Sequence, residues 1–464
     1  MSENKPNNKE IELLEEELQA LAADPTGDQR RQLDLLNQLA WAIRHFDPQR
    51  ALLLSQTAYT LVQQQAYPAG RLACLLNLAV LNTLVAPHYE VAFPLINEAL
   101  DLLESHPNPM IHTYLSLCLA SIYRQLGDYP TTHTHLMQAL TLSRQTNDPA
   151  LEGFVLNDLG VLYRYTHNYE QGLKSYHQAL TIAQTTGNHQ RVALAMNNIG
   201  DLLNLWGRAA EARPYLEEAL ALTRQLGIKI LEPSVLDSLS ELHIQQGKYA
   251  EALACLQQAQ VMVTAFDNQA ELATFLRNIA RVYQQQQAWT LALEYLHRAL
   301  TVAESIQFQQ EIYTCHHLLA EIYEHQGDPA KALYHYKQFH SVKEELFNEQ
   351  ADQKLKTLQV IHETATARRE AEIYRLRNVE LQMALDKVKQ LSGLLPICSG
   401  CKKIRDDSGY WQDVAVYIRD HSEAEFSHGI CPDCRERLYP RGRTLTKGMV
   451  NNDPNPIAPL NSLL

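Results

Sequence analysis

The sequence has few of the features that mark secreted, fibrous and membrane proteins. Its 464 residues include 8 cysteines, too few for a disulfide-stapled scaffold. The 18 glycines and 19 prolines exclude collagen and low-complexity chains. The longest apolar stretch, residues 72–86, is interrupted by polar residues and is too short to span a bilayer, so the sequence predicts no membrane span. Since the first ten residues, MSENKPNNKE, are polar, we expect no signal peptide and a cytoplasmic location.

The chain also lacks an excess of basic charge. Its formal net charge is −13, and all of it lies in residues 1–340, because residues 341–464 carry 18 basic and 18 acidic side chains. An acidic surface repels phosphate backbones. The sequence therefore predicts no direct binding to nucleic acid. Its 45% of hydrophobic residues suffice for a sizeable core.

What the sequence does contain is an internal repeat of forty residues. A large aliphatic residue followed by a small one recurs at this spacing. The pairs are Leu39-Ala40, Leu119-Ala120, Leu159-Gly160, Ile199-Gly200, Leu239-Ser240, Ile279-Ala280 and Leu319-Ala320. An alanine column runs in register with them from Ala99 to Ala299. This regularity indicates a repeat architecture.

Each unit has the pattern of two helices joined by a polar turn. Leu156, Leu159 and Tyr163 recur at helical spacing before a polar break at 166–168. One such pair cannot bury its own apolar face, so the units must stack. The segments NDLGVLYRYTHNYEQGLKSYHQAL (157–180) and NNIGDLLNLWGRAAEARPYLEEAL (197–220) resemble the long variant of the tetratricopeptide repeat. The resemblance implies an all-α, right-handed superhelical solenoid.

We predict five segments. Residues 1–32 form a tail with a capping helix, and 33–345 form the solenoid of about eight repeats. Residues 346–393 form a helical arm, 394–440 a small α+β metal module, and 441–464 a disordered tail.

The resemblance implies a concave groove that holds a protein or peptide, and bacterial relatives with long repeats include peptide-responsive regulators. The groove positions are Arg124, Asn157, Arg164, Tyr165, Asn197, Asp201 and Asn204. Asparagine both donates and accepts, which suits an extended peptide backbone. Arg124 and Arg164 lie one repeat apart and could grip a carboxylate. The alternative is that the asparagines link adjacent repeats and the arginines pair with nearby acids.

The arm carries a heptad pattern. Its seam comprises Tyr374, Asn378, Leu381, Leu385 and Val388. An asparagine at a core position favours a parallel two-stranded register. We predict a homodimer through 346–395; the alternative is a solvated helix packed on the last repeat. Residues 367–381 also resemble the connecting helix of bacterial signalling proteins, although no output enzyme follows here.

Two Cys-x-x-Cys pairs follow the arm. Cys398 and Cys401 form the first, and Cys431 and Cys434 form the second. Two such pairs complete a tetrahedral four-sulfur site, so we predict one structural zinc ion in a module that resembles a treble clef. His428 would hydrogen-bond a sulfur or replace a ligand. A redox dithiol and an iron–sulfur cluster are the weaker alternatives.

The sequence contains no phosphate loop, no G-x-S-x-G and no H-E-x-x-H motif, so we expect no enzymatic activity. The main hypothesis is a protein–protein interaction scaffold or signalling adaptor. The alternative is a peptide-responsive regulator whose solenoid changes shape on binding.

Overall fold

The computed structural model describes residues 8–23, 28–63, 65–85, 87–391, 396–406, 408–421 and 429–438. The chain forms two compact units, residues 1–369 and residues 370–464. The tail expected at 441–464 and the side chain of His428 lie outside the described residues.

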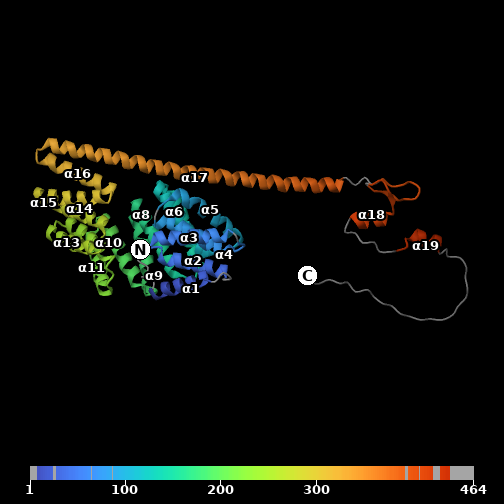
Figure 1. Cartoon of the computed structure of the whole chain (residues 1–464), viewed down its shortest axis with the longest axis horizontal. Helices are drawn as coiled ribbons and strands as arrows, with labels where there is room; N and C mark the ends of the chain where they lie inside the picture. Colours follow the sequence, from blue (N-terminus) through green and yellow to red (C-terminus); the bar gives the residue numbers. More distant parts are fainter. Residues whose placement is uncertain are drawn as a thin grey trace. The chain divides into compact units, whose positions relative to one another are not determined.

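The described part of the first unit consists of helices (Figure 1). They are α1 (Asn8–Ala23), α2 (Gln29–Ile43), α3 (Pro48–Val62), α4 (Pro68–Val80), η1 (Leu81–Val85), α5 (Tyr89–Ser105), α6 (Pro109–Leu126), α7 (Tyr129–Ser143), α8 (Pro149–Tyr165), α9 (Tyr169–Thr185), α10 (His189–Leu205), α11 (Ala209–Leu226), α12 (Glu232–Gln245), α13 (Tyr249–Ala265), α14 (Gln269–Gln285), α15 (Trp289–Ser305), α16 (Gln309–His325) and the first part of α17 (Pro329–Leu391). Successive helices pack in pairs, from α2 with α3 to α14 with α15. His316 of α16 contacts His335 of α17, so these two helices form the last pair. The predicted all-α solenoid of stacked helix pairs is confirmed.

The small residues of the repeat column lie where the two helices of a pair approach most closely. A Cβ added at Gly160 of α8 would lie 2.4 Å from the ring of Tyr176 of α9. A Cβ at Gly200 of α10 would lie 2.4 Å from the side chain of Leu216 of α11. Tyr176 and Leu216 are buried. The large residue of one helix therefore occupies the space that the small residue of the other leaves open.

The turns between paired helices use a left-handed residue. Gly127 ends α6 with φ of +83°, and the Asp128 side chain then accepts a hydrogen bond from the Thr131 N–H to cap α7. In other repeats a non-glycine residue takes the left-handed conformation, as at His167 with φ of +56° and Gln287 with φ of +59°. The fold therefore tolerates the backbone cost of a side chain at this position.

One described helical window, Pro68–Val85, is long and apolar enough to cross a membrane by length and composition. This corrects the expectation that the apolar stretch is too short. The window is 67% buried, because α4 and η1 pack within the core shared with α5 and α6. Such burial is typical of a core helix in a repeat array.

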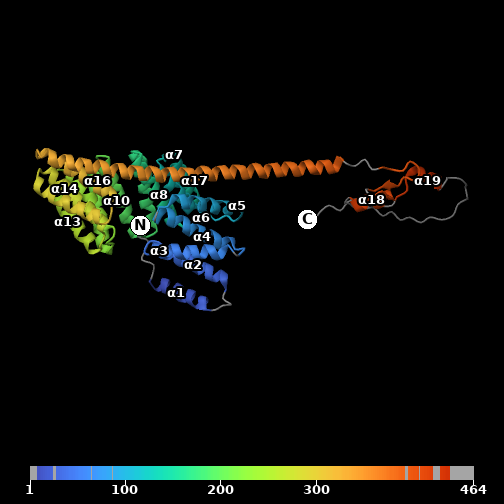
Figure 2. The ribbon, with the colours of Figure 1, turned by 45° about the horizontal axis from the view of Figure 1, so that its top comes forward.

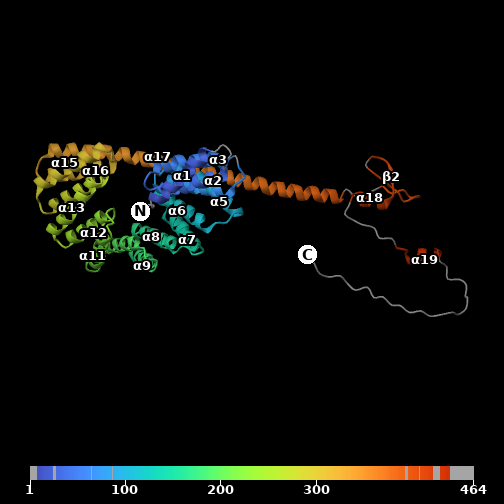
Figure 3. The same ribbon diagram turned by 60° about the horizontal axis from the view of Figure 1, so that its bottom comes forward.

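α17 begins as the second helix of the last repeat and continues without a break to Leu391. The arm expected from residue 346 is therefore the same helix as the end of the solenoid. In Figure 3 the paired helices follow an arc from α16 through α11 and α9 to α6, and α17 runs across its open side. Figure 2 shows α17 passing alongside α6 and α5 as well.

The chain closes on itself where α17 crosses the N-terminal repeats. Val360 and Ile361 pack against the core of α4, α5 and α6, and the neighbouring Thr357 is 2% exposed. The Arg368 guanidinium donates to the Asn97 carbonyl at 3.0 Å and also pairs with Asp101 of α5. We call these four α17 residues the closing contact. It joins the last repeat helix to the second and third repeats.

The second unit contains the rest of α17 and a small module. Strands β1 (Ile404–Arg405) and β2 (Trp411–Gln412) pair antiparallel with Ile404 opposite Gln412, and α18 (Val414–His421) and α19 (Pro432–Leu438) follow. Among the described residues of this unit, the buried side chains are those of Ile404 and Tyr417. The module therefore has almost no apolar core.

Candidate functional site

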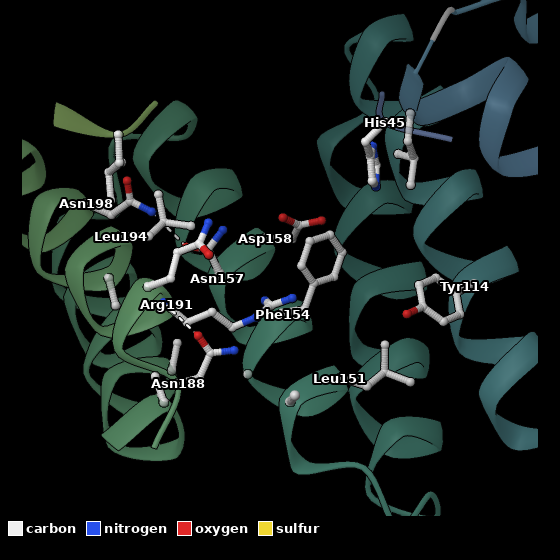
Figure 4. A pocket seen from close by; sticks show the side chains of 18 of the residues that line it. His45, Tyr114, Leu151, Phe154, Asn157, Asp158, Asn188, Arg191, Leu194 and Asn198 are labelled. Atoms are coloured by element: carbon white, nitrogen blue, oxygen red, sulfur yellow. Dashed lines mark hydrogen bonds between the residues drawn. The ribbon is translucent and has the colours of Figure 1, made fainter. Parts of the chain in front are cut away.

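A cavity of about 900 Å³ opens among the first helices of the N-terminal and central repeats. Residues of α2, η1, α6, α8 and α10 contribute to its wall, together with parts of α9 and α12 (Figure 4). Trp41, Tyr89, Tyr114, Phe154 and Leu151 give the wall its apolar character. Apolar pockets with a few convergent polar groups are typical ligand sites.

Two adjacent helices supply several of the polar groups of the cavity. Asn157 and Asp158 lie on α8. Arg191 and Asn198 lie on α10, seven residues apart and therefore on the same face of that helix. The Asn198 amide donates to the Asn157 carbonyl oxygen at 2.7 Å. The Arg191 guanidinium lies 5.4 Å from the centre of the Phe154 ring. Figure 4 shows these side chains facing the same space.

Asp158 is one of the carboxyl groups in the cavity wall. Burial raises its pKa to about 6 from an ordinary value of 3.8, while the positive charges of Arg124 and Arg191 and a hydrogen bond from Asn157 oppose the rise. The net shift means that the two arginines do not fully compensate the loss of water around this carboxyl. The group therefore changes charge close to physiological pH.

Asn197 of α10 has an unused acceptor at the cavity wall. Its side chain is 8% exposed, and within the described part of the chain its Oδ1 has no hydrogen-bond partner. A buried acceptor without a partner costs about 1–3 kcal/mol. A ligand that brings an N–H group to this oxygen would recover that free energy.

Comparison with known proteins identifies much of this scaffold. The tetratricopeptide repeat family model matches residues 151–225, 231–305 and 271–345. These residues are tetratricopeptide repeats. They include α8 and α10, two helices that supply polar groups of the cavity. No protein of curated function matches the chain significantly.

Several solved structures share the fold. The apo form of the quorum sensor NprR from B. thuringiensis is 14% identical, with a TM-score of 0.56 over 73% of this chain and 94% of that one. Aspartyl phosphate phosphatase F from Bacillus subtilis is 12% identical, with a TM-score of 0.50 over 74% of this chain and 95% of that one. A signal transduction ATPase with a tetratricopeptide repeat sensor, from Pyrococcus horikoshii, is 17% identical, with a TM-score of 0.52 over 76% of this chain and 55% of that one. At these identities the likeness shows the fold alone.

The solenoid brings three of the seven predicted groove residues to the cavity. Arg124, Asn157 and Asn197 line it. The other four lie outside the lining. Arg164 and Asp201 form an ion pair at 3.2 Å, Asn204 donates to the Ser238 carbonyl at 3.0 Å, and Tyr165 is 55% exposed.

The alternative interpretation of the asparagine ladder accounts for part of it. Asn198 bonds Asn157, and Asn278 donates to Asp237 at 2.9 Å, in both cases across 41 residues. These bonds link successive first helices of the tetratricopeptide array. Asn197 is the member of the ladder that combines burial, cavity lining and an unpaired oxygen.

Sequence reasoning missed Arg191, Asp158 and Phe154. Phe154 and Asp158 are four residues apart on α8, and Arg191 precedes Asn198 by seven on α10. This spacing places each set on one helix face. The forty-residue pattern, by contrast, reveals only residues that recur at equivalent positions of several repeats. It cannot indicate a functional side chain that occurs in a single repeat.

In the second unit, the described seam residues of the arm are exposed. Tyr374 is 69%, Leu381 59% and Leu385 47% exposed, and Asn378 is exposed as well. The side chain of Val388 lies outside the described residues. An exposed apolar stripe on a helix is suited to a partner helix, and the homodimer stays a prediction.

The predicted metal ligands occur as two separate pairs. Cys398 and Cys401 lie before β1, and Cys431 and Cys434 lie at the start of α19. Within the described ranges of the chain, no three metal-binding side chains are gathered at one point. The zinc ion is therefore still a prediction.

Proposed function

We propose that the protein is a peptide-responsive regulator that holds an extended peptide in the cavity between α6, α8 and α10. The observation that carries this proposal is Oδ1 of Asn197, a buried acceptor without a partner on the wall of a ligand-sized cavity. A peptide N–H is the complementary donor.

The other lining groups suit the remaining parts of a short peptide. Arg124 and Arg191 would bind a carboxylate, either the peptide's C-terminus or an acidic side chain. Tyr114, Phe154 and Leu151 would contact an apolar side chain. A bound carboxylate would also compete with Asp158 for the same two arginines. Binding would then be coupled to the protonation of Asp158.

The likeness of fold to the quorum sensor NprR is consistent with a sensory role. A curved array of repeats can convert a small local change into a change of pitch, because small rotations add over successive repeats. In the regulator we propose, such a change of pitch is the response to the peptide.

A scaffold that binds a protein without changing shape is the second candidate. The exposed apolar stripe at Tyr374, Leu381 and Leu385 favours an assembly role for the arm. The two candidates differ in their response: a regulator changes its dimensions when its ligand binds, and a scaffold does not.

The test is affinity selection from a pool of synthetic heptapeptides, with bound peptides identified by mass spectrometry. We expect the parent to retain a subset, and the Asn197→Ala variant to lose it. The matched control is Asn348→Ala, which changes an exposed asparagine of α17. Small-angle X-ray scattering with a retained peptide then distinguishes regulator from scaffold. Equal retention by the parent and Asn197→Ala would refute the assigned site.

A further inference from the structure

The two cysteine pairs of the second unit share one local geometry although 29 residues separate them. The Cys401 N–H donates to Sγ of Cys398 at 3.5 Å. The Cys434 N–H donates to Sγ of Cys431 at 3.4 Å. In each pair, the backbone N–H of the second cysteine therefore donates a hydrogen bond to the sulfur of the first. An N–H group that donates to a sulfur stabilises negative charge on it, and a sulfur that binds a metal carries that charge.

The first pair is fixed by the strand that follows it. The Cys398 N–H donates to the Lys403 carbonyl and the Lys402 N–H donates to the Cys398 carbonyl, both at 2.9 Å. Lys402 adopts a left-handed φ of +62°, which a residue with a side chain adopts only when its surroundings impose it. Ile404 pairs with Ile397 and with Gln412, so the turn is held at both ends.

The second pair is fixed by a helix start. Pro432 is the first residue of α19, where its ring suits the helical backbone and its missing N–H costs nothing. Cys431 precedes it and Cys434 falls in the first turn. Each pair thus places two cysteines in one turn, next to a hairpin in the first case and at a helix start in the second.

The module needs a stabilising element besides apolar packing. Ile404 and Tyr417 are its buried side chains in the described ranges, and a unit this small is rarely stable with so little core. The four thiols form no disulfide and are exposed or partly exposed. The cysteines of the repeats differ: burial raises the pKa of Cys74 to about 11 and that of Cys118 to about 12, as expected for inert packing thiols.

We propose that Cys398, Cys401, Cys431 and Cys434 bind one Zn²⁺ as four thiolates. The geometry supplies two preformed half-sites, and the described residues do not bring them together. A metal ion bound by both half-sites would cross-link α19 to the turn that precedes β1. Each thiol that is still protonated releases its proton to solvent on binding. Because four sulfurs complete the coordination of zinc, the site would be structural rather than catalytic.

The first test measures metal in the full-length protein purified without chelators. We expect about one zinc per chain by inductively coupled plasma mass spectrometry. Cys398→Ser and Cys434→Ser, made singly, should each lose it, because each removes a ligand from a different half-site. The matched control is Cys255→Ser, which changes a partly exposed cysteine of the repeats. Far-UV circular dichroism of each variant shows whether the repeat helices still fold.

The second test uses Co²⁺ added to the metal-free parent and needs no variant. A tetrahedral four-thiolate site gives thiolate-to-cobalt charge-transfer bands and intense d–d absorption, and zinc should abolish both by displacement. Zinc retained by either serine variant, iron as the bound metal, or a cobalt spectrum without thiolate bands would each overturn the proposal.

Discussion

Gly160 sets the distance between α8 and α9. A methyl group there would approach the buried ring of Tyr176 to 2.4 Å, so the ring or the helix must shift. We expect Gly160→Ala to lower the free energy of unfolding by about 1–3 kcal/mol, as overpacking does. Urea denaturation measures the change.

Gly153→Ala in the same helix is the control for this variant. The nearest neighbour of a Cβ at Gly153 is the end of the Ile182 side chain at 3.2 Å, which needs a far smaller shift. Alanine also favours the helix over glycine at both positions. Equal denaturation midpoints for the two variants would show that close helix contact does not explain the small-residue column.

Asp158 predicts a specific dependence of stability on pH. Its folded pKa of about 6 lies above the ordinary value of 3.8, so the folded state keeps a proton that the unfolded chain loses. The contribution of this carboxyl to the free energy of unfolding therefore falls as pH rises from about 4 to about 6, and it is constant above pH 6. At about 1.4 kcal/mol per pKa unit, Asp158→Asn should be more stable than the parent at pH 7 by up to about 3 kcal/mol.

Urea denaturation at pH 4, 5.5 and 7 measures this difference, which should shrink toward pH 4. Asp128→Asn is a control, because the pH dependence of its effect on stability should have the opposite sign. Hydrogen bonds from Thr131 lower the pKa of Asp128, so its contribution is lost as pH falls. A stability difference between Asp158→Asn and the parent that does not vary with pH would refute the assignment of a raised pKa.

At the scale of an element, α17 carries the predicted dimer seam. Leu381→Asp together with Leu385→Asp places charges in that seam, so we expect the parent to sediment at twice the 52.8 kDa chain mass and the variant at the chain mass. Analytical ultracentrifugation measures both.

Met383→Asp changes an exposed residue of α17 outside the seam and should leave the dimer intact. A parent that sediments as a monomer would refute the seam. Loss of the dimer in Met383→Asp would instead place the interface on another face of the helix.

The helices of the solenoid could be predicted because each obeys local rules. The column through Gly160 and Gly200 marks the closest approach of paired helices, and such spacing is visible in the sequence. The partners of the groove residues were harder to predict. Arg164 could pair with a ligand or with Asp201 of the next repeat, and the sequence pattern allows both; in the structure it pairs with Asp201.

The course of α17 could be predicted only in part. Its composition predicts a long helix, and the structure has one from Pro329 to Leu391. The surface that it meets depends on the curvature of the whole array, which is a sum of small rotations between repeats. The pairing of Arg368 with Asp101, 267 residues away, has no signal in either local sequence.

At the scale of the whole first unit, we expect the closing contact to maintain the curvature of the arc of repeats. Ile361→Asp places a charge against the core of α4, α5 and α6, and we expect the arc to open. Small-angle X-ray scattering should show a larger radius of gyration, and amide hydrogen exchange in α5 should accelerate.

Leu358→Asp is the matched control, because Leu358 is 50% exposed on the same helix. Leu358→Asp should change neither the radius of gyration nor the rate of amide hydrogen exchange in α5. An unchanged radius of gyration and unchanged exchange in Ile361→Asp would mean that the curvature of the repeats alone sets the arc.

The closing contact also has a consequence during synthesis. The surface of α4, α5 and α6 leaves the ribosome well before Val360 and Ile361 are made, some 240 residues later. At a synthesis rate of about 5–20 residues per second, this surface stays exposed for on the order of 10–50 s before α17 can pack on it. The N-terminal repeats must therefore remain folded, or be protected by a chaperone, with an apolar face exposed to the cell. Variants that destabilise them would lower the yield of protein before they alter any finished molecule.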